Sequence, residues 1–324
     1  MKAVTRTKYG GPEVLEVRDI PQPEPKDDEI LVRVHATTVN RTDCGILTAT
    51  PFPIRFFTGL FKPKSLVPGT DFAGVVVAIG GKVTNFRTGD RVWGLNDEGL
   101  ASHAEYLVIK EDAAVIPIPE NIDFEEAVGC AEGGHYAFNF LNKVKLVEGS
   151  KVLVNGATGA IGSSALQQLK SRNIYITAVG NTKNLKLLEQ LGADKVLNYE
   201  EVDFTEADDE QYDFIFDAVG KSSYSKSKKL LKRNGIYISS ELGPGAENLY
   251  LHLITKIRGG KRVIFPIPID RKRSLLHLKE LFENGYLQAV IDRKYSVEEI
   301  QDAYRYVLKG QKTGSVLIVF YSDD

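Results

Sequence analysis

The order of hydrophobic and polar positions divides the chain into two parts. Up to about residue 120 the apolar positions form short runs broken by Gly and Pro, which is typical of a compact, mostly β domain. We expect its strands at residues 15–17, 29–38, 72–79, 90–94 and 104–109. From Lys151 onward, strand-like runs alternate with helical patterns of about ten residues, which predicts a parallel sheet covered by helices.

The second part supplies enough strands for a doubly wound sheet, so the fold class is α/β. The six predicted strands lie at residues 151–155, 173–179, 195–199, 212–220, 235–240 and 262–269. Helices are predicted at residues 160–171 and 184–191. A helical segment at residues 273–283 and a strand at residues 315–320 have no place in that sheet, so we expect the C-terminal stretch to return to the first domain.

Composition and charge narrow the range of partners. With 324 residues the chain is long enough for two domains, and its net charge of −2 argues against a broad surface for nucleic acid or an anionic membrane. We therefore expect a small-molecule substrate. The N-terminus lacks a signal-peptide pattern and no apolar run is long enough to span a membrane, so a cytoplasmic protein is expected. The acidic run at residues 200–211 is interpreted as a solvated loop.

A glycine-rich turn joins the first strand and helix of the α/β part. Gly156, Gly159 and Gly162 permit, in that order, a tight turn, the close approach of a pyrophosphate, and close packing of helix and strand. The phosphate would lie at the helix N-terminus, where free N–H groups favour anions. The alternative is a glycine-rich turn that binds nothing. The other cofactor contacts predicted here are Ala157, Thr158, Ala160 and Ile161.

The end of the second predicted strand bears on the choice of cofactor. An NAD site would place Asp or Glu there, whereas this chain has Gly180, Asn181, Thr182 and Lys183. With no acid to repel a 2′-phosphate and with Lys183 and a hydroxyl available, NADPH is favoured over NADH. In the alternative interpretation Thr182 is the N-cap of the next helix and Lys183 is a surface charge, and both interpretations can hold together.

These residues, together with PGTDFAG at 68–74, TGDRVWG at 88–94 and LGADKVLNY at 191–199, give the chain a family resemblance. It resembles the medium-chain dehydrogenase/reductase superfamily, and within it the zinc-free quinone oxidoreductase branch. The resemblance implies a GroES-like catalytic domain at residues 1–121, a Rossmann NADPH-binding domain at 122–268, and a segment at 269–324 that returns to the catalytic domain. It also implies a cofactor cleft where the domains meet, and a homodimer joined through the strand at 262–269, with prolines 266 and 268 limiting the pairing.

The zinc ligands of the related alcohol dehydrogenases are mostly replaced. Asn40 stands where the resemblance places the first cysteine ligand, Thr70 stands where it places the histidine, and Cys130 alone survives. One thiolate cannot hold catalytic zinc, and only two cysteines are present, so a four-cysteine structural site is excluded as well. We therefore expect no metal. The implied reaction is hydride transfer from NADPH to a quinone or to the β-carbon of an α,β-unsaturated carbonyl compound.

Several side chains are candidates for the reacting end. Asn40 and Asp43 match the family's Asn-x-x-Asp positions near the nicotinamide, but they could instead only satisfy a buried loop. Gly45 stands where some quinone reductases place a tyrosine, so that proton donor is absent. His135 or Tyr136 could relay a proton, although a single helical histidine is more often structural. Cys130 is interpreted as a small packed hydrophobe rather than as a reactive thiol.

Further cofactor contacts are expected where strands end. Residues 218–220 and 240–243 end consecutive predicted strands at the carboxyl edge of the sheet, where open α/β sheets bind ligands, so Ala218, Val219 and Leu242 are expected contacts. The resemblance adds Tyr199, at the end of LGADKVLNY, and Thr313 in the closing motif GQKTGSVLI.

The aromatic and basic segment at residues 50–65 has no clear periodicity. Two interpretations stay open: a loop over an apolar substrate pocket, or a hydrophobic anchor of the domain or a dimer contact. Two other functions also remain open. One is a non-catalytic NADPH-binding redox sensor or crystallin-like protein, and the other is a zinc-type alcohol dehydrogenase with unusual ligands.

Overall fold

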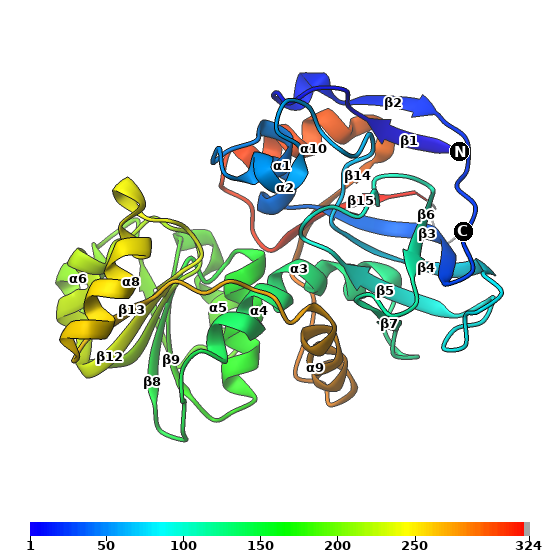
Figure 1. Cartoon of the computed structure of the whole chain (residues 1–324). Coiled ribbons are helices and arrows are strands. Elements are labelled where there is room, and N and C mark those ends of the chain that lie inside the picture. Colours follow the sequence, from blue (N-terminus) through cyan, green and yellow to red (C-terminus); the bar gives the residue numbers. More distant parts are fainter. Residues whose placement is uncertain (321–324) are drawn as a thin grey trace. The chain divides into compact units, whose positions relative to one another are not determined.

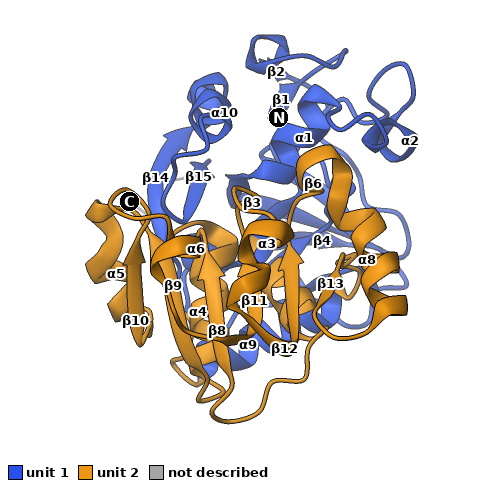
Figure 2. Cartoon of the chain, turned by 90° about the vertical axis from the view of Figure 1, so that its left-hand side faces the viewer, with its two compact units in different colours: residues 1–132, 271–283, 288–324 blue, residues 133–270, 284–287 orange. Residues whose placement is uncertain are grey.

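The computed structural model describes residues 1–320, which form two compact units, coloured separately in Figure 2. Unit 1 contains Met1–Glu132, Arg271–Glu283 and the C-terminal segment from Gln288, and unit 2 contains Gly133–Asp270 and Asn284–Leu287. Most of the C-terminal stretch thus lies in unit 1, although Asn284–Leu287 lie in unit 2, and the predicted domain boundaries stay a prediction. The helix α3 (Phe124–Leu141) begins in unit 1 and ends in unit 2.

Unit 1 is built on a seven-stranded sheet and a separate strand pair, β1 with β2. The order of the larger sheet is β14-β15-β3-β4-β5-β7, and β6 also pairs with β3. Figure 1 shows β15, from the end of the chain, beside β3 from its beginning, and the two pair antiparallel with Val316 opposite Val39. The strands are β1 (Lys2–Thr5), β2 (Glu16–Asp19), β3 (Glu29–Val39), β4 (Asp71–Ile79), β5 (Arg91–Leu95), β6 (Tyr106–Lys110), β7 (Val115–Pro117), β14 (Ile291–Ser296) and β15 (Ser315–Val319).

Two large hydrophobic clusters hold unit 1 together, and a smaller one contains Ala3, Val67 and Ala104. One fills the sheet with Ile30, Val32, Phe72 and Leu107. The other packs helices onto the sheet: α10 (Ile300–Leu308) buries Ile300, Ala303, Tyr304 and Val307, a spacing that places all four on one face. The remaining helices of unit 1 are α1 (Arg41–Thr48), α2 (Ile54–Thr58) and α9 (Arg271–Glu283), with short 3-10 helices η1 (Pro12–Val14) and η5 (Val297–Glu299).

Unit 2 is a six-stranded parallel sheet in the order β10-β9-β8-β11-β12-β13, so the predicted doubly wound sheet is confirmed. Its first strand in sequence, β8, lies between β9 and β11, and the strand order reverses there. The strands are β8 (Lys151–Asn155), β9 (Tyr175–Gly180), β10 (Lys195–Asn198), β11 (Tyr212–Asp217), β12 (Leu231–Ser239) and β13 (Arg262–Ile264). The helices are α4 (Ala160–Lys170), α5 (Leu185–Gln190), α6 (Phe204–Ala207), α7 (Tyr224–Ser227) and α8 (Glu247–Arg258), with η2 (Thr182–Asn184), η3 (Lys228–Leu230) and η4 (Pro244–Ala246).

The structure corrects several sequence-based expectations. The strand predicted at 262–269 ends at Ile264, shortly before the prolines at 266 and 268 that cannot donate to a ladder. Joining of two copies through this edge strand stays a prediction. The strands β1, β7 and β14 and the helices α1, α2, α6, α7, α8 and α10 were not predicted. Within residues 1–320, no helix is both long enough and apolar enough to span a bilayer.

Candidate functional site

The glycine-rich turn of unit 2 lies between β8 and α4. Gly156 has a φ of 73°, and a Cβ atom there would lie 2.6 Å from Cβ of Val219. A Cβ atom on Gly162 would lie 2.3 Å from the carbonyl oxygen of Gly156, so close packing of helix and turn requires glycine. Gly159 is extended before α4 and provides no side-chain cap, which leaves the first N–H groups of the helix available to an anion. These features agree with the predicted pyrophosphate site, and binding there stays a prediction.

The other residues predicted around this turn lie close to it. The buried Ala157 donates its N–H to the carbonyl of Val179 at 3.1 Å, which ties the turn to β9. Leu188 and Thr158 pack closely against Gly180 at the end of β9. A Cβ atom on Gly180 would lie 2.6 Å from Leu188 and 3.2 Å from the methyl group of Thr158. Ala160 and Ile161 form the first turn of α4.

A carboxylate that the sequence analysis missed, that of Glu200 after β10, binds Thr182 just beyond the end of β9. Thr182 donates both its hydroxyl, at 2.7 Å, and its N–H, at 3.0 Å, to Oε2 of Glu200. Asn198 donates in turn to the Thr182 hydroxyl at 2.9 Å. These bonds from Thr182, together with the charge of Lys183, lower the pKa of Glu200 below its ordinary value, so it is ionised at neutral pH. The interpretation that no acid stands here is therefore wrong for the folded chain.

The neighbouring side chains complete this corner of unit 2. Asn181, not Thr182, occupies the N-cap position of η2, and its side chain makes no capping bond. The buried Oδ1 atom of Asn181 has no hydrogen-bond partner, so it can accept a bond from a ligand hydroxyl. Tyr199 is half exposed and its N–H binds the carbonyl of Gly180 at 3.0 Å. Lys183 is exposed.

The turn after β11 is arranged by Asp217, which the sequence analysis also missed. This fully buried carboxylate accepts from the N–H groups of Val219 and Gly220 at 3.3 and 2.9 Å, and from Tyr237 Oη at 3.0 Å. The N–H of Ala218 binds the carbonyl of Asn155 at 2.9 Å. The predicted contacts Ala218 and Val219 thus belong to a turn held in one shape beside the end of β8.

Leu242 follows β12, and its carbonyl accepts the N–H of Asn248 at 3.0 Å at the start of α8. The acidic run at 200–211 is more structured than a solvated loop, because it contains α6 and the buried Asp208, which pairs with Lys195 at 2.8 Å.

Asn40 and Asp43, the predicted catalytic pair in unit 1, form the capping box of α1. Oδ1 of Asn40 accepts the N–H of Asp43 at 2.8 Å, and the Asp43 carboxylate accepts the N–H of Asn40 at 3.1 Å. Both residues are at least 96% buried, at 4% and 2% exposure. Burial raises the pKa of Asp43 well above its ordinary value, and the nearby carboxylate of Asp71 raises it further. These contacts agree with the alternative interpretation, in which Asn40 and Asp43 only satisfy buried backbone groups. A catalytic role for the two residues stays a prediction.

Asn40 is also hydrogen-bonded to Thr70, the other residue that replaces a zinc ligand of the related alcohol dehydrogenases. Its Nδ2 donates to Thr70 Oγ1 at 2.8 Å and to Thr38 Oγ1 at 3.2 Å, and Thr38 donates to Asp71 at 2.6 Å. Cys130 is buried, and burial raises the pKa of its thiol. Among residues 1–320, no group of three or more His, Cys, Asp or Glu side chains could hold a metal ion.

A third buried carboxyl of unit 1, Glu132, lies close to this network. Its Oε1 accepts the hydroxyl of Thr42 at 3.0 Å, and the residue is 8% exposed. Burial raises the pKa of Glu132 to about 7, although the charge of Lys312 and the Thr42 bond act in the opposite direction. Burial lowers the pKa of Lys312. Glu132 is therefore a buried acid that changes its charge near neutral pH, and no motif in the sequence marked it.

His135 and Thr313 lie in different units. His135 is fully buried in α3, with Nδ1 3.1 Å from Nδ2 of Asn139 one helical turn later, and its ring stacks edge-on with Tyr136. This environment suits a structural histidine. Thr313, in unit 1, donates its N–H to Asp292 at 2.7 Å. The roles proposed for both residues remain untested.

Comparison with known proteins places these features in a family. Residues 26–120 match the family described as the alcohol dehydrogenase GroES-like domain, and residues 191–318 match the family described as zinc-binding dehydrogenase. The human quinone oxidoreductase is 30% identical over 342 residues, and the alignment covers 98% of each chain. The chloroplastic NADPH-dependent alkenal/one oxidoreductase of Arabidopsis thaliana is 29% identical over 338 residues, which cover 98% of this chain and 79% of that protein.

The solved structures show the same relationship. The quinone oxidoreductase of Escherichia coli in complex with NADPH superposes with a TM-score of 0.82 at 25% sequence identity, covering 99% of this chain and all of that one. The GroES-like domain and the Rossmann-type parallel sheet expected from the sequence are thus both confirmed. The chain belongs to the medium-chain dehydrogenase/reductase family of NAD(P)-binding oxidoreductases, among the quinone oxidoreductases.

Proposed function

We propose that the chain reduces a quinone or an α,β-unsaturated carbonyl compound with hydride from NADPH and without a metal ion. The observation that carries the proposal is the 2.8 Å hydrogen bond between Asn40 and Thr70. Zinc alcohol dehydrogenases place two zinc ligands at these positions, whereas an amide bonded to a hydroxyl is a poor zinc site. Without a Lewis acid to stabilise an alkoxide, oxidation of simple alcohols loses its main support, but activated acceptors need less assistance.

The residues of unit 2 fit a dinucleotide, and NADPH when bound supplies the hydride. The turn from Gly156 to Gly162 would receive the pyrophosphate on backbone N–H groups. Oδ1 of Asn181 is available to accept a ribose hydroxyl. Lys183 and the two donors of Thr182 suit a 2′-phosphate, provided that Glu200 releases Thr182. The NADPH bound to the Escherichia coli relative and the name of the Arabidopsis relative support this choice of cofactor.

Reduction of either acceptor also consumes a proton, and we propose Glu132 as its source. Its pKa of about 7 keeps a proton on the carboxyl in roughly half of the molecules at neutral pH. The half-buried Thr42, whose hydroxyl binds Glu132 at 3.0 Å, can pass a proton on by reversing its hydrogen bond. The tyrosine that some relatives carry is replaced here by Gly45, so another source is needed.

The proposal is tested by measuring NADPH consumption with a panel of quinones, enones and simple aldehydes. We expect turnover with quinones or enones, little with aldehydes, and faster reaction with NADPH than with NADH. Tight NADPH binding with no turnover on the whole panel would favour a redox sensor instead. Zinc present at one atom per chain, and required for turnover, would favour the zinc alcohol dehydrogenase alternative.

A further inference from the structure

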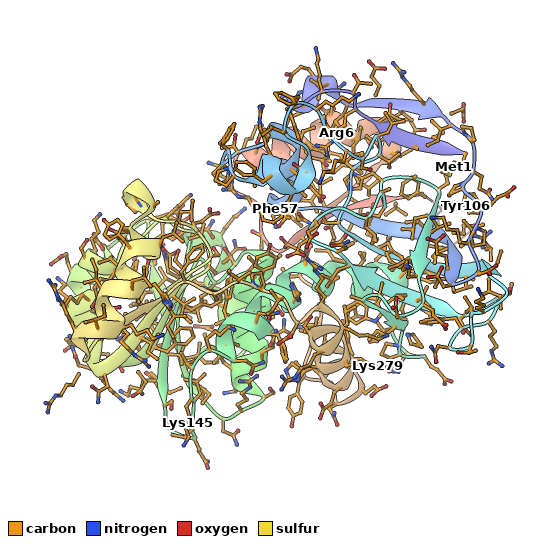
Figure 3. The ribbon with its side chains drawn as sticks, viewed as in Figure 1. Met1, Arg6, Phe57, Tyr106, Lys145 and Lys279 are labelled. Atoms are coloured by element: carbon orange, nitrogen blue, oxygen red, sulfur yellow. The ribbon has the colours of Figure 1, made fainter. Side chains whose placement is uncertain are left out.

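Unit 1 exposes an unusual group of aromatic side chains on residues 50–65, which we call the aromatic loop. Figure 3 labels one of them, Phe57, on the short helix α2. Four phenylalanines and a leucine within ten residues stand largely in solvent: Phe52 at 58%, Phe56 at 65%, Phe57 at 68%, Leu60 at 43% and Phe61 at 89% exposure. Single exposed apolar side chains are ordinary, but a contiguous group of this kind marks an interaction surface. The aromatic loop is therefore not a hydrophobic anchor inside the domain.

The aromatic loop holds its side chains outward through a defined backbone. The N–H of Lys64 binds the carbonyl of Thr58 at 2.8 Å, which closes the turn that carries Phe61. Gly59 has a φ of 125°, and a Cβ atom there would lie 2.0 Å from the carbonyl oxygen of Lys62. The Tyr9 hydroxyl donates to the carbonyl of Gly59 at 2.7 Å and ties the turn to the N-terminal part of unit 1. The turn that carries Phe61 is thus held by hydrogen bonds and by a glycine that it requires.

All charged side chains of the aromatic loop are positive. Between residues 44 and 70 the chain contains Arg55, Lys62 and Lys64 and no acidic residue, although the whole chain has a net charge of −2. The two flanking acids, Asp43 and Asp71, are 2% and 0% exposed. Lys62 and Lys64 are exposed beside Phe61. The aromatic side chains are therefore surrounded by positive charge that no acid of the segment neutralises.

We propose that the aromatic loop docks unit 1 on the surface of an anionic lipid bilayer. Phenylalanine and leucine side chains insert at the boundary between head groups and acyl chains, and basic residues near the surface are attracted to anionic lipids. The aromatic loop combines both features in one short segment. The contact is interfacial, so it requires no membrane-spanning helix.

Two other occupants fit these features less well. A symmetric contact between two copies that is centred on the aromatic loop would bring the three basic residues of one copy next to those of the other, and they would then repel each other. A substrate pocket encloses most of its ligand in concave walls, whereas Phe57 and Phe61 stand 68% and 89% exposed. A lipid surface needs neither an opposing acid in the chain nor a concavity.

The test is sedimentation of the full chain with phospholipid vesicles. We expect binding to phosphatidylcholine vesicles that contain about 30% phosphatidylserine, and weak binding to pure phosphatidylcholine. Binding should decrease between about 0.1 and 0.5 M salt, because the electrostatic part is screened. The double variant Phe57→Ser/Phe61→Ser should bind roughly tenfold or more weakly. Neutralising each lysine, Lys62→Gln and Lys64→Gln, should weaken binding about fivefold per residue.

A matched control is Ile257→Ser, which removes an equally exposed apolar side chain, at 87%, from α8 of unit 2. It should bind vesicles as the wild type does, and circular dichroism should show all variants folded. Absence of wild-type binding to the anionic vesicles overturns the proposal, as does equal loss of binding in Ile257→Ser. A dimer in solution that Phe57→Ser/Phe61→Ser dissociates, with no vesicle binding, identifies a second copy as the occupant and also overturns it.

Discussion

Replacing Glu132 by glutamine isolates the titration of one buried acid in unit 1. The carboxyl is 8% exposed, and burial raises its pKa from the ordinary value of 4.5 to about 7. Between pH 4.5 and about pH 7 the carboxyl of the folded chain holds a proton that the unfolded chain has released. The free energy of unfolding therefore falls as the pH rises through this range. Between pH 5 and pH 8 this single group should remove about 2.5 kcal/mol of stability.

The Glu132→Gln variant keeps the shape of the side chain but cannot ionise, so this part of the pH dependence should disappear. Urea unfolding at pH 5 and pH 8 measures it, because the other titrating groups are common to both proteins and cancel in the comparison. Glu120→Gln, at an exposed position, serves as the control and should keep the wild-type pH dependence. Equal pH dependence in the wild type and in Glu132→Gln would refute the reasoning, and with it the choice of Glu132 as proton source.

Three further substitutions test other parts of the structure. Glu200→Gln removes the negative charge that is bonded to Thr182. Fluorescence titration should then show the affinity for NADPH rising roughly threefold or more relative to the affinity for NADH. The control Glu201→Gln leaves that bond intact and should not change the ratio of the two affinities. Gly162→Ala should lower the free energy of unfolding by about 1–3 kcal/mol and weaken NADPH binding, because the new Cβ atom would lie 2.3 Å from a carbonyl oxygen. The control Gly81→Ala, at a position with open space around it, should change neither the stability nor the binding. Asn40→Ala removes the cap of α1 and should cost about 1–2 kcal/mol in urea unfolding; an unchanged midpoint would contradict the capping role.

The parts of the fold that depend on local patterns could be predicted from the sequence. The spacing of Gly156, Gly159 and Gly162 predicts the turn, and Gly156 and Gly162 each meet a local steric demand, whereas a Cβ atom on Gly159 would make only an ordinary contact at 3.6 Å. The central strands of unit 2 contain short apolar runs, at 152–154 in β8 and 214–216 in β11, since both faces of a parallel sheet are buried. The strand at 262–269 was predicted too long because its prolines were interpreted as limiting dimer pairing rather than as ending the strand.

The missed residues depend on contacts between separate segments. Glu200 reaches Thr182 from the neighbouring strand, and the rule that parallel strands end at one edge could have found it. Asp217 organises the turn at Val219 through bonds that no spacing reveals. The pKa of Glu132 depends on burial, which a single sequence does not specify.

Transfer of deuterium from NADPH that carries deuterium at both C4 positions to an enone, with protein treated with a chelator and checked for metal content, tests the central claim most directly. The proposed reaction predicts one deuterium at the β-carbon of the product, formed at a rate that neither chelation nor added zinc changes. Asn40 and Thr70 already bind each other at 2.8 Å, so added zinc has no ligand pair to occupy there. Product without deuterium at the β-carbon, or a rate lost on chelation and restored by zinc, would contradict the proposal.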